Sequence, residues 1–203
     1  MTANPSKLRD RRSQLTRDEI LGAARRLFAE RGYASTSVRD IAREAGVSPQ
    51  TVYDSVGSKS DLVARLNDLI DVEAGVAALA GAMAESDDAA YVAATSARIT
   101  RAIVTSCGDI LRTLVAGASA EPDLAGVIAE GHRRHLSGAR HVVDRLHRMR
   151  ALRRGAEPET AAQSLAAVSD FRIALVLHDA YGWSLDEVEA WIVTQSRRVL
   201  FDA

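Results

Sequence analysis

The chain has 203 residues, of which 47% are hydrophobic and only 4% aromatic, and its formal net charge is −1 at neutral pH. This length allows one domain or two small ones, and the composition favours packed helices over β-sheet. The single cysteine, Cys107, excludes an internal disulfide and fits a reducing compartment. We find no apolar signal segment at the N-terminus, and the longest weakly polar run, 74–84, is far shorter than the roughly 20 residues that span a bilayer. We therefore expect a soluble, cytoplasmic protein without a membrane partner.

The charge is distributed unevenly along the chain. Residues 1–66 contain 12 Lys and Arg against 8 Asp and Glu, a net charge of +4, whereas residues 67–203 carry a net charge of −5. A basic end on an otherwise acidic chain suggests a polyanionic partner at that end, although a chance imbalance would look the same. The basic, aperiodic residues 1–15 predict a disordered arm that reaches a DNA groove or its phosphates, or else a solvated tail without a role.

Two short helices follow a first amphipathic helix, which we expect to begin with the capping pair Thr16 and Glu19. The second helix starts at Val38 and ends at Gly46, a residue suited to the left-handed conformation that ends helices. Ser48 and the proline after it are good first residues for a third helix, which extends to about residue 56. Two helices joined by a short glycine-containing turn predict a helix-turn-helix, whose second helix enters the DNA major groove.

The first residues of such a recognition helix face the base edges, and here they are Ser48, Pro49, Gln50 and Thr51. Gln50 has the amide that pairs with adenine through two hydrogen bonds, and the Pro49 ring or the Thr51 methyl group can contact a thymine methyl.

Helical periodicity continues to the end of the chain. Ser58 and Asp61 form a capping box that opens a fourth helix, and Ser184 and Glu187 form another that opens the last one. Between them we expect helices over 74–84, 89–105, 110–115, 121–149 and 159–181, with an interruption at Cys107 and Gly108. The sequence thus predicts an all-α protein of about nine helices.

The segment from Thr16 to about Leu66 resembles the DNA-binding domain of the tetracycline-repressor (TetR/AcrR) family. The matching residues are Ile20, Ala23, Ala24, Leu27, Phe28, Gly32, Tyr33, Thr36, Val38, Arg39, Ile41, Ala42, Ala45, Gly46, Val47, Ser48, Thr51, Val52, Tyr53, Lys59 and Leu62. The resemblance implies a three-helix helix-turn-helix domain over 16–61 and a helical ligand-binding and dimerisation domain over 62–203.

The resemblance also places phosphate contacts on Thr36 or Ser37, Arg39, Thr51, Tyr53 and Lys59. Hydroxyl, guanidinium and ammonium groups beside a recognition helix are suited to holding phosphates. The alternative is that Ser37 and Ser48 only cap helices and that Tyr53 only packs.

The chain departs from the family pattern after Tyr53. Many members have an aromatic residue or His and then Phe, whereas this chain has Asp54, Ser55 and Val56. Phosphates would repel Asp54, so it either points away from the DNA or accepts a hydrogen bond from a cytosine amine. No operator sequence can therefore be transferred from a relative.

In the family, the helices beyond the fourth enclose a ligand pocket. The polar residues on the corresponding helices here are Tyr91, Arg98, Arg112, His132 and His135. The alternatives are structural histidines, in the core or on the surface, and a surface ion pair for Arg112.

The last two helices form an apolar hairpin, and two copies of it would make a four-helix dimer interface with twofold symmetry. The family resemblance implies the same dimer, while a monomeric core hairpin is the alternative. The residues that we expect at this interface are Phe171, Leu175, His178, Val188, Trp191, Ile192 and Val199.

His132 and His135, with His141, Asp144 and His147 further along, suggest a metal site on one helix. No carboxylate completes an HExxH or ExxH motif, and four neighbouring arginines would repel a cation. We predict no metal, no cofactor and no catalysis. The hypothesis is a cytoplasmic, nucleoid-associated homodimer that represses transcription from a pseudo-palindromic double-stranded operator and is released by a small, apolar or amphipathic effector. The rivals are an architectural DNA-binding protein without ligand control and, remotely, a helical metal-dependent enzyme.

Overall fold

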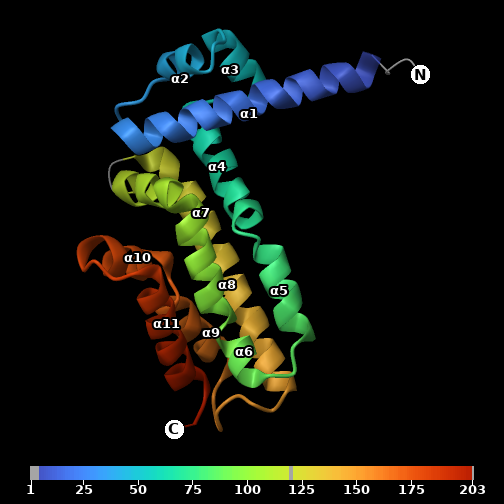
Figure 1. Cartoon of the computed structure of the whole chain (residues 1–203), viewed down its shortest axis with the longest axis vertical. Coiled ribbons are helices and arrows are strands. Elements are labelled where there is room, and N and C mark those ends of the chain that lie inside the picture. Colours follow the sequence, from blue (N-terminus) through green and yellow to red (C-terminus); the bar gives the residue numbers. More distant parts are fainter. Residues whose placement is uncertain (1–4, 119–120, 203) are drawn as a thin grey trace. The chain divides into compact units, whose positions relative to one another are not determined.

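The structure, a computed structural model, describes residues 5–118 and 121–202, and all regular secondary structure in these two ranges is helical (Figure 1). The all-α prediction is therefore confirmed. The chain divides into two compact units, Met1–Asp68 with Arg112–Ile128 and Leu69–Leu111 with Ala129–Ala203. Helices α4, α7 and α8 each contribute residues to both units.

The first unit contains the predicted helix-turn-helix. Helices α1 (Pro5–Arg31), α2 (Val38–Glu44) and α3 (Pro49–Ser55) pack against one another, and α4 (Lys59–Glu73) follows. Their shared core consists of side chains that are almost wholly buried, namely Ile20, Leu27, Phe28, Ile41, Val52 and Leu62. Because these apolar residues recur at helical spacing, burying them fixes the rotation of each helix about its own axis.

The predicted disordered arm is wrong where the structure describes it, because α1 begins at Pro5 and not at Thr16. Proline suits the first turn of a helix, and the Arg- and Gln-containing sequence that follows has good helix propensity. Contacts between residues four apart support this extension, since Gln14 Nε2 donates to Asp18 Oδ1 over 2.8 Å. Residues 1–4 of the predicted arm lie outside the described residues.

Local side-chain bonds fix the turns of the first unit. Ser37 and Asp40 form a capping box at α2, and Ser48 accepts a hydrogen bond from the backbone N–H of Thr51 at α3. Gly46 has a φ of 67°, as the turn between α2 and α3 requires. The predicted caps at these helix starts are therefore confirmed.

The remaining helices lie along the chain in the following order: α5 (Val76–Glu85), α6 (Ala89–Ala93), α7 (Thr95–Gly117), the 3₁₀-helix η1 (Pro122–Leu124), α8 (Ala125–Arg148), α9 (Pro158–Val168), α10 (Phe171–Leu175), the π-helical turn η2 (Val176–Ala180) and α11 (Leu185–Leu200). The predicted interruption appears as a kink in α7, where Cys107 has φ −131° and ψ 20°. The capping box of Ser184 and Glu187 at α11 is also confirmed.

The single helix predicted over 159–181 is wrong, because the chain breaks at Ser169 and Asp170. The Asp170 side chain accepts the backbone N–H of Arg172 and caps α10, while the Ser169 hydroxyl donates to the Leu165 carbonyl at the end of α9. Residues 158–180 are long and apolar enough to span a bilayer by length and composition, and the 18-residue window that meets this criterion has a mean hydropathy of 1.2 and is 44% buried inside the fold.

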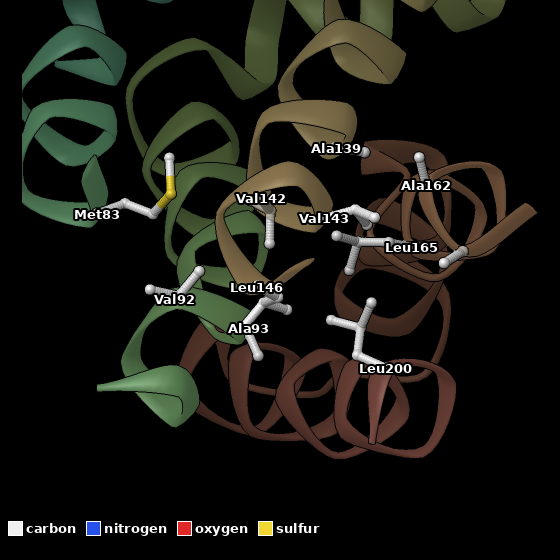
Figure 2. Packing of buried hydrophobic residues seen from close by; sticks show 11 residues of the cluster. Met83, Val92, Ala93, Ala139, Val142, Val143, Leu146, Ala162, Leu165 and Leu200 are labelled. Atoms are coloured by element: carbon white, nitrogen blue, oxygen red, sulfur yellow. The ribbon is translucent and has the colours of Figure 1, made fainter. Parts of the chain in front are cut away.

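One hydrophobic core cluster of the second unit joins α5, α6, α8, α9 and α11 (Figure 2). The cluster includes Val142, Val143 and Leu146 of α8, Leu165 of α9 and Leu200 of α11, and all five side chains are at most 2% exposed. Other side chains of α8, three or four residues apart, lie on a different face of the helix and can line a binding site.

Candidate functional site

One face of the recognition helix α3 is buried against the domain, and the other face is exposed to solvent. Val52 is fully buried, whereas Pro49, Gln50 and Asp54 are exposed and the Tyr53 side chain is 52% exposed. One buried residue on a seven-residue helix therefore fixes which side chains α3 presents to solvent.

The Gln50 side chain bonds Asp54, the residue at which the chain departs from the family pattern. Its Nε2 donates a hydrogen bond to Asp54 Oδ1 over 2.8 Å, one helical turn away. An amide nitrogen has two N–H groups, so this bond leaves one donor and the Oε1 acceptor for the two contacts that adenine requires. Asp54 is thus placed to orient Gln50.

The flanking residues that were expected to hold phosphates are in different situations. Arg39 is exposed on α2 and has no side-chain partner among the described residues. Lys59, by contrast, donates from Nζ to the Tyr33 carbonyl over 2.8 Å and lies 3.9 Å from the centroid of the Tyr33 ring. Thr36 is 2% exposed, with its hydroxyl 2.8 Å from the Gly32 carbonyl oxygen, so it stabilises the turn before α2.

The three remaining hydroxyls belong to helix caps. Ser37 bonds Asp40, and Ser48 Oγ lies 2.8 Å from Thr51 Oγ1. Hydrogen bonds from Ser37, and after them one from Arg43, hold the pKa of Asp40 below its ordinary value. Hydrogen bonds from Ser58 lower the pKa of Asp61 in the same way at the start of α4. Both carboxylates therefore stay ionised and keep their caps at neutral pH.

The second unit contains a cavity of about 510 Å³, within the size range of small-molecule sites. One side is apolar, formed by Val76, Ala80, Met83 and Ala84 of α5, Ile99 of α7, and Ala139 and Val142 of α8. The polar lining consists of Asp71 of α4, Thr95 and Ser96 of α7, and Arg134, His135, Ser137, His141, Arg145 and Arg148 of α8. The cavity is therefore amphipathic.

Of the five residues expected at a ligand pocket, only His135 lines this cavity. Arg98 instead stacks on the Tyr91 ring, with its guanidinium carbon 3.8 Å from the ring centroid, and donates to the Tyr91 carbonyl over 2.6 Å. Arg112 and His132 are exposed and do not line the cavity.

The sequence reasoning missed the arginines of this cavity. Arg134, His141, Arg145 and Arg148 follow one another at intervals of three, four and seven residues, so they share one face of α8. That periodicity was visible in the sequence. Of these residues, Arg134 and Arg145 enter the sequence-based prediction only as charges that would repel a metal cation, and His141 only as a possible metal ligand.

The residues expected at a dimer interface divide into two groups. Leu175, Val188 and Ile192 are at most 6% exposed in the single chain, so they belong to its own core. Phe171, His178, Trp191 and Val199 are half-buried. The exposed apolar side chains of this region are instead Val176 and Tyr181, which are 50% and 68% exposed.

Within the described ranges, no three His, Cys, Asp or Glu side chains come together as metal ligands. His135 bonds the chain itself, since its Nε2 lies 2.9 Å from the Ala166 carbonyl oxygen. The histidines of α8 thus form no cluster in the part of the chain that the structure describes.

Helices α1, α2 and α3 pack together, and α3 is capped by Ser48 and exposed on one face. This arrangement defines a helix-turn-helix domain. Residues 20–66 match the family model described as bacterial regulatory proteins, tetR family. Residues 20–66 are therefore a domain of the tetR-family type, which occurs in transcriptional regulators.

The curated relatives reported next each match about a third of this chain. The regulator HbdR of Aromatoleum sp. (strain CIB) is 38% identical over 63 residues, which are 31% of this chain and 25% of HbdR. AcrR of Shigella flexneri is 40% identical over 63 residues, 31% of this chain and 29% of AcrR. The match therefore spans less than a third of either relative.

Solved structures resemble the whole fold. NalD of Pseudomonas aeruginosa, a repressor of a multidrug efflux pump, is 21% identical with a TM-score of 0.74, and the match covers 93% of this chain and 98% of NalD. The complex of SmeT, a repressor from Stenotrophomonas maltophilia, with triclosan has 20% identity and a TM-score of 0.74, with 93% of this chain and 92% of SmeT covered. At these identities the likeness concerns the fold alone.

Proposed function

We propose that this protein is a sequence-specific, DNA-binding transcriptional regulator, most simply a repressor, that acts in the cytoplasm on nucleoid DNA. The observation that carries the proposal is the exposed face of α3, with Gln50 oriented by Asp54 and Tyr53 beside it, in a TetR-family domain. Gln50 reads an adenine, and Pro49 or the Thr51 methyl group contacts a thymine methyl. Arg39, Tyr53 and the Lys59 ammonium hold phosphates and set the register.

A small molecule in the second unit controls this binding. The amphipathic cavity supports the proposal, and SmeT, which has the same fold, has been crystallised with the small molecule triclosan. Helix α4 is continuous from Lys59, a proposed phosphate contact, to Asp71, which lines the cavity. A ligand that shifts the end of α4 therefore acts on the DNA-binding domain through a single helix.

The regulator binds DNA as a homodimer on a pseudo-palindromic operator. A helix-turn-helix protein gains affinity by binding two half-sites through twofold symmetry. Two partly or fully exposed apolar side chains next to the α10–α11 hairpin, Val176 and Tyr181, support an interface at this place. The core residues Val188 and Ile192 stabilise the hairpin from inside.

The test is selection of bound fragments from a pool of random duplex DNA, at moderate salt and with scrambled competitor DNA. We expect enrichment of a sequence with two related half-sites about one or two helical turns apart. Binding without preference for any duplex would contradict the proposal. If a preferred duplex is found but no compound in a broad thermal-shift screen stabilises the protein, ligand control fails and an architectural role remains.

A further inference from the structure

The cavity of the second unit carries an excess of positive charge. Its lining contains three arginine side chains but only one carboxylate, that of Asp71. Asp71 Oδ2 lies 3.3 Å from Arg134 Nη1, so this carboxylate is already engaged at one end of the cavity. The other two arginines, Arg145 and Arg148, have no carboxylate beside them in the lining.

Only some of the N–H donors of the Arg145 side chain have hydrogen-bond partners within the protein. Its Nη2 donates to the Ser86 carbonyl over 2.7 Å and to Asp87 Oδ1 over 2.9 Å. The Asp87 side chain is 97% exposed, so solvent screens this ion pair strongly. Arg145 Nε is buried and has no hydrogen-bond partner among the described residues. A buried N–H without a partner is unfavourable, so a ligand that accepts this hydrogen bond gains affinity.

Arg148 lies one turn further along α8 and lines the same cavity. No hydrogen bond or ion pair joins its side chain to another described residue. The two arginines are three residues apart, which places both guanidinium groups on one side of the helix. Two donors so arranged suit a planar anion, because guanidinium groups bind carboxylates through paired hydrogen bonds.

The opposite wall and the length of the cavity describe the rest of the ligand. Val76, Ala80 and Met83 of α5 and Ile99 of α7 form an apolar surface. The lining extends along α8 from Arg134 to Arg148, which corresponds to about 21 Å at the helical rise per residue. An elongated apolar body with one charged end fits these dimensions.

We propose that the effector is an elongated amphipathic anion, an alkyl or arylalkyl carboxylate, whose carboxylate binds Arg145 and Arg148. Its apolar chain lies along the α5 and α7 wall toward Asp71. The negative end of the α8 macrodipole opposes an anion there, but it amounts to about half a charge and two full positive charges exceed it. The role as effector rests on the proposed function above, whereas binding of the anion does not.

Binding is tested on the full chain without DNA, by calorimetry and thermal shift, with decanoate and decylamine below their micelle concentrations and decanol below its solubility limit. These three compounds share an alkyl chain and differ in the charge of the head group. We expect decanoate to raise Tm and to bind about ten-fold or more tightly than decanol, with no stabilisation by decylamine. Equal affinity for decanol or decylamine would overturn the inference. So would failure of every carboxylate in a series from octanoate to tetradecanoate, with phenylalkanoates included.

Matched variants locate the anion. Arg148→Met, at an exposed position where misfolding is not expected, should lower decanoate affinity about ten-fold and leave decanol affinity unchanged. Arg145→Met should do the same, and Arg145→Lys should recover part of the binding. Arg133→Met is the control, since Arg133 lies on the same helix outside the cavity and pairs with Glu130. Normal decanoate binding by both Met variants would overturn the assignment of the site.

The two proposals fail in different ways. A protein that prefers carboxylates but binds no duplex would overturn the regulatory function and leave the anion site standing. A protein that selects an operator but binds neutral amphiphiles best would overturn only the inference about the anion. Carboxylate binding that leaves operator affinity unchanged would overturn the effector role. Release of the operator by decanoate, abolished by Arg148→Met, supports both proposals.

Discussion

Gln50 and Arg39 test two different kinds of DNA contact. Gln50→Ala should cost roughly 1–3 kcal/mol at particular base pairs only, because it removes the proposed bidentate base contact. Arg39→Ala should weaken binding to all duplexes and lower the slope of log K against log salt by about one, because it removes the proposed phosphate contact. Fluorescence anisotropy on single-substitution operators at several salt concentrations measures both. Uniform weakening by Gln50→Ala would show that this residue does not read a base.

Lys59 differs from Arg39 because it also stabilises the fold. Its ammonium bonds the Tyr33 carbonyl and lies over the Tyr33 ring, which itself packs on Phe28. Lys59→Met should therefore lower the free energy of unfolding by about 1 kcal/mol in addition to weakening DNA binding. Denaturant unfolding checks this, with Arg39→Ala as the variant expected to lose DNA affinity alone. An unchanged midpoint for Lys59→Met would mean that the Tyr33 contact contributes nothing.

The start of α3 was predictable because Ser48 and Pro49 are local signals of a helix start. The sequence did not predict that the Thr36 hydroxyl bonds backbone carbonyls or that the Lys59 ammonium bonds the Tyr33 carbonyl. The Lys59 contact joins residues 26 positions apart and forms only when the start of α4 meets the turn between α1 and α2. Sequence spacing carries no information on such a contact.

The turn between α3 and α4 depends on a glycine. Gly57 has a φ of 111°, and a Cβ built there would lie 2.4 Å from Asp61 Oδ2, the carboxylate that caps α4. Gly57→Ala should therefore destabilise the protein by about 1–3 kcal/mol through strain and loss of this cap. Gly22→Ala is the control within α1, where an added Cβ makes only an ordinary contact at 3.5 Å and should be neutral or stabilising. Urea unfolding measures the stability of both variants. Equal free energies of unfolding for the two would contradict this role of Gly57.

The break between α9 and α10 should make stability depend on pH. Burial alone would raise the pKa of Asp170, but hydrogen bonds from Arg172 outweigh it, so the pKa lies below its ordinary value. The ionised carboxylate therefore stabilises the fold above the ordinary Asp pKa, and this stabilisation is lost as the pH falls through the lowered value. Asp170→Asn keeps a capping oxygen but loses the charge, and it should cost about 1 kcal/mol at pH 7, reduced by the exposure of Arg172.

Unfolding curves measured from neutral to acidic pH provide the check. The difference between the natural chain and Asp170→Asn should shrink as the pH falls. A difference that stays constant down to strongly acidic pH would contradict the role of the charge.

Helix starts with a serine cap were predictable because caps are local, whereas the break after α9 was not. The serine caps of α2, α3, α4 and α11 follow from short sequence patterns. The break after α9 is held by the local bonds of Ser169 and Asp170 and also by Thr100, whose hydroxyl donates to the Ser169 carbonyl over 2.7 Å across 69 residues. The extension of α1 to Pro5 was missed for another reason, since a basic surface without periodicity resembles a disordered segment.

Dimerisation should depend on the exposed side chains at η2. Tyr181→Asp and Val176→Asp place a charge where the proposed interface is apolar, so they should shift the protein from dimer to monomer and lower operator affinity. Analytical ultracentrifugation measures the mass, and Val72→Asp, a change at a 75% exposed valine of α4, is the control. A dimer that persists in both η2 variants would place the interface elsewhere.

The cavity was the least predictable feature of the molecule. Periodicity indicates which side of each helix is apolar, and it did so for α8. It does not say which helices will meet, and the cavity lining comes from α4, α5, α7 and α8, spread over residues 71–148. Candidate residues chosen one helix at a time therefore included Tyr91 and Arg98, which bond each other instead.

The kink in α7 contains the only cysteine of the chain. Cys107 is fully buried, and its thiol lies 3.5 Å from Glu73 Oε2. A thiol reagent can reach this sulfur only when the second unit opens locally, so the modification rate of the unaltered protein reports how often that opening occurs. Cys107 is thus a natural probe of local opening. A bound compound that stabilises the second unit should slow the modification of this thiol, and no engineered label is needed to measure the effect.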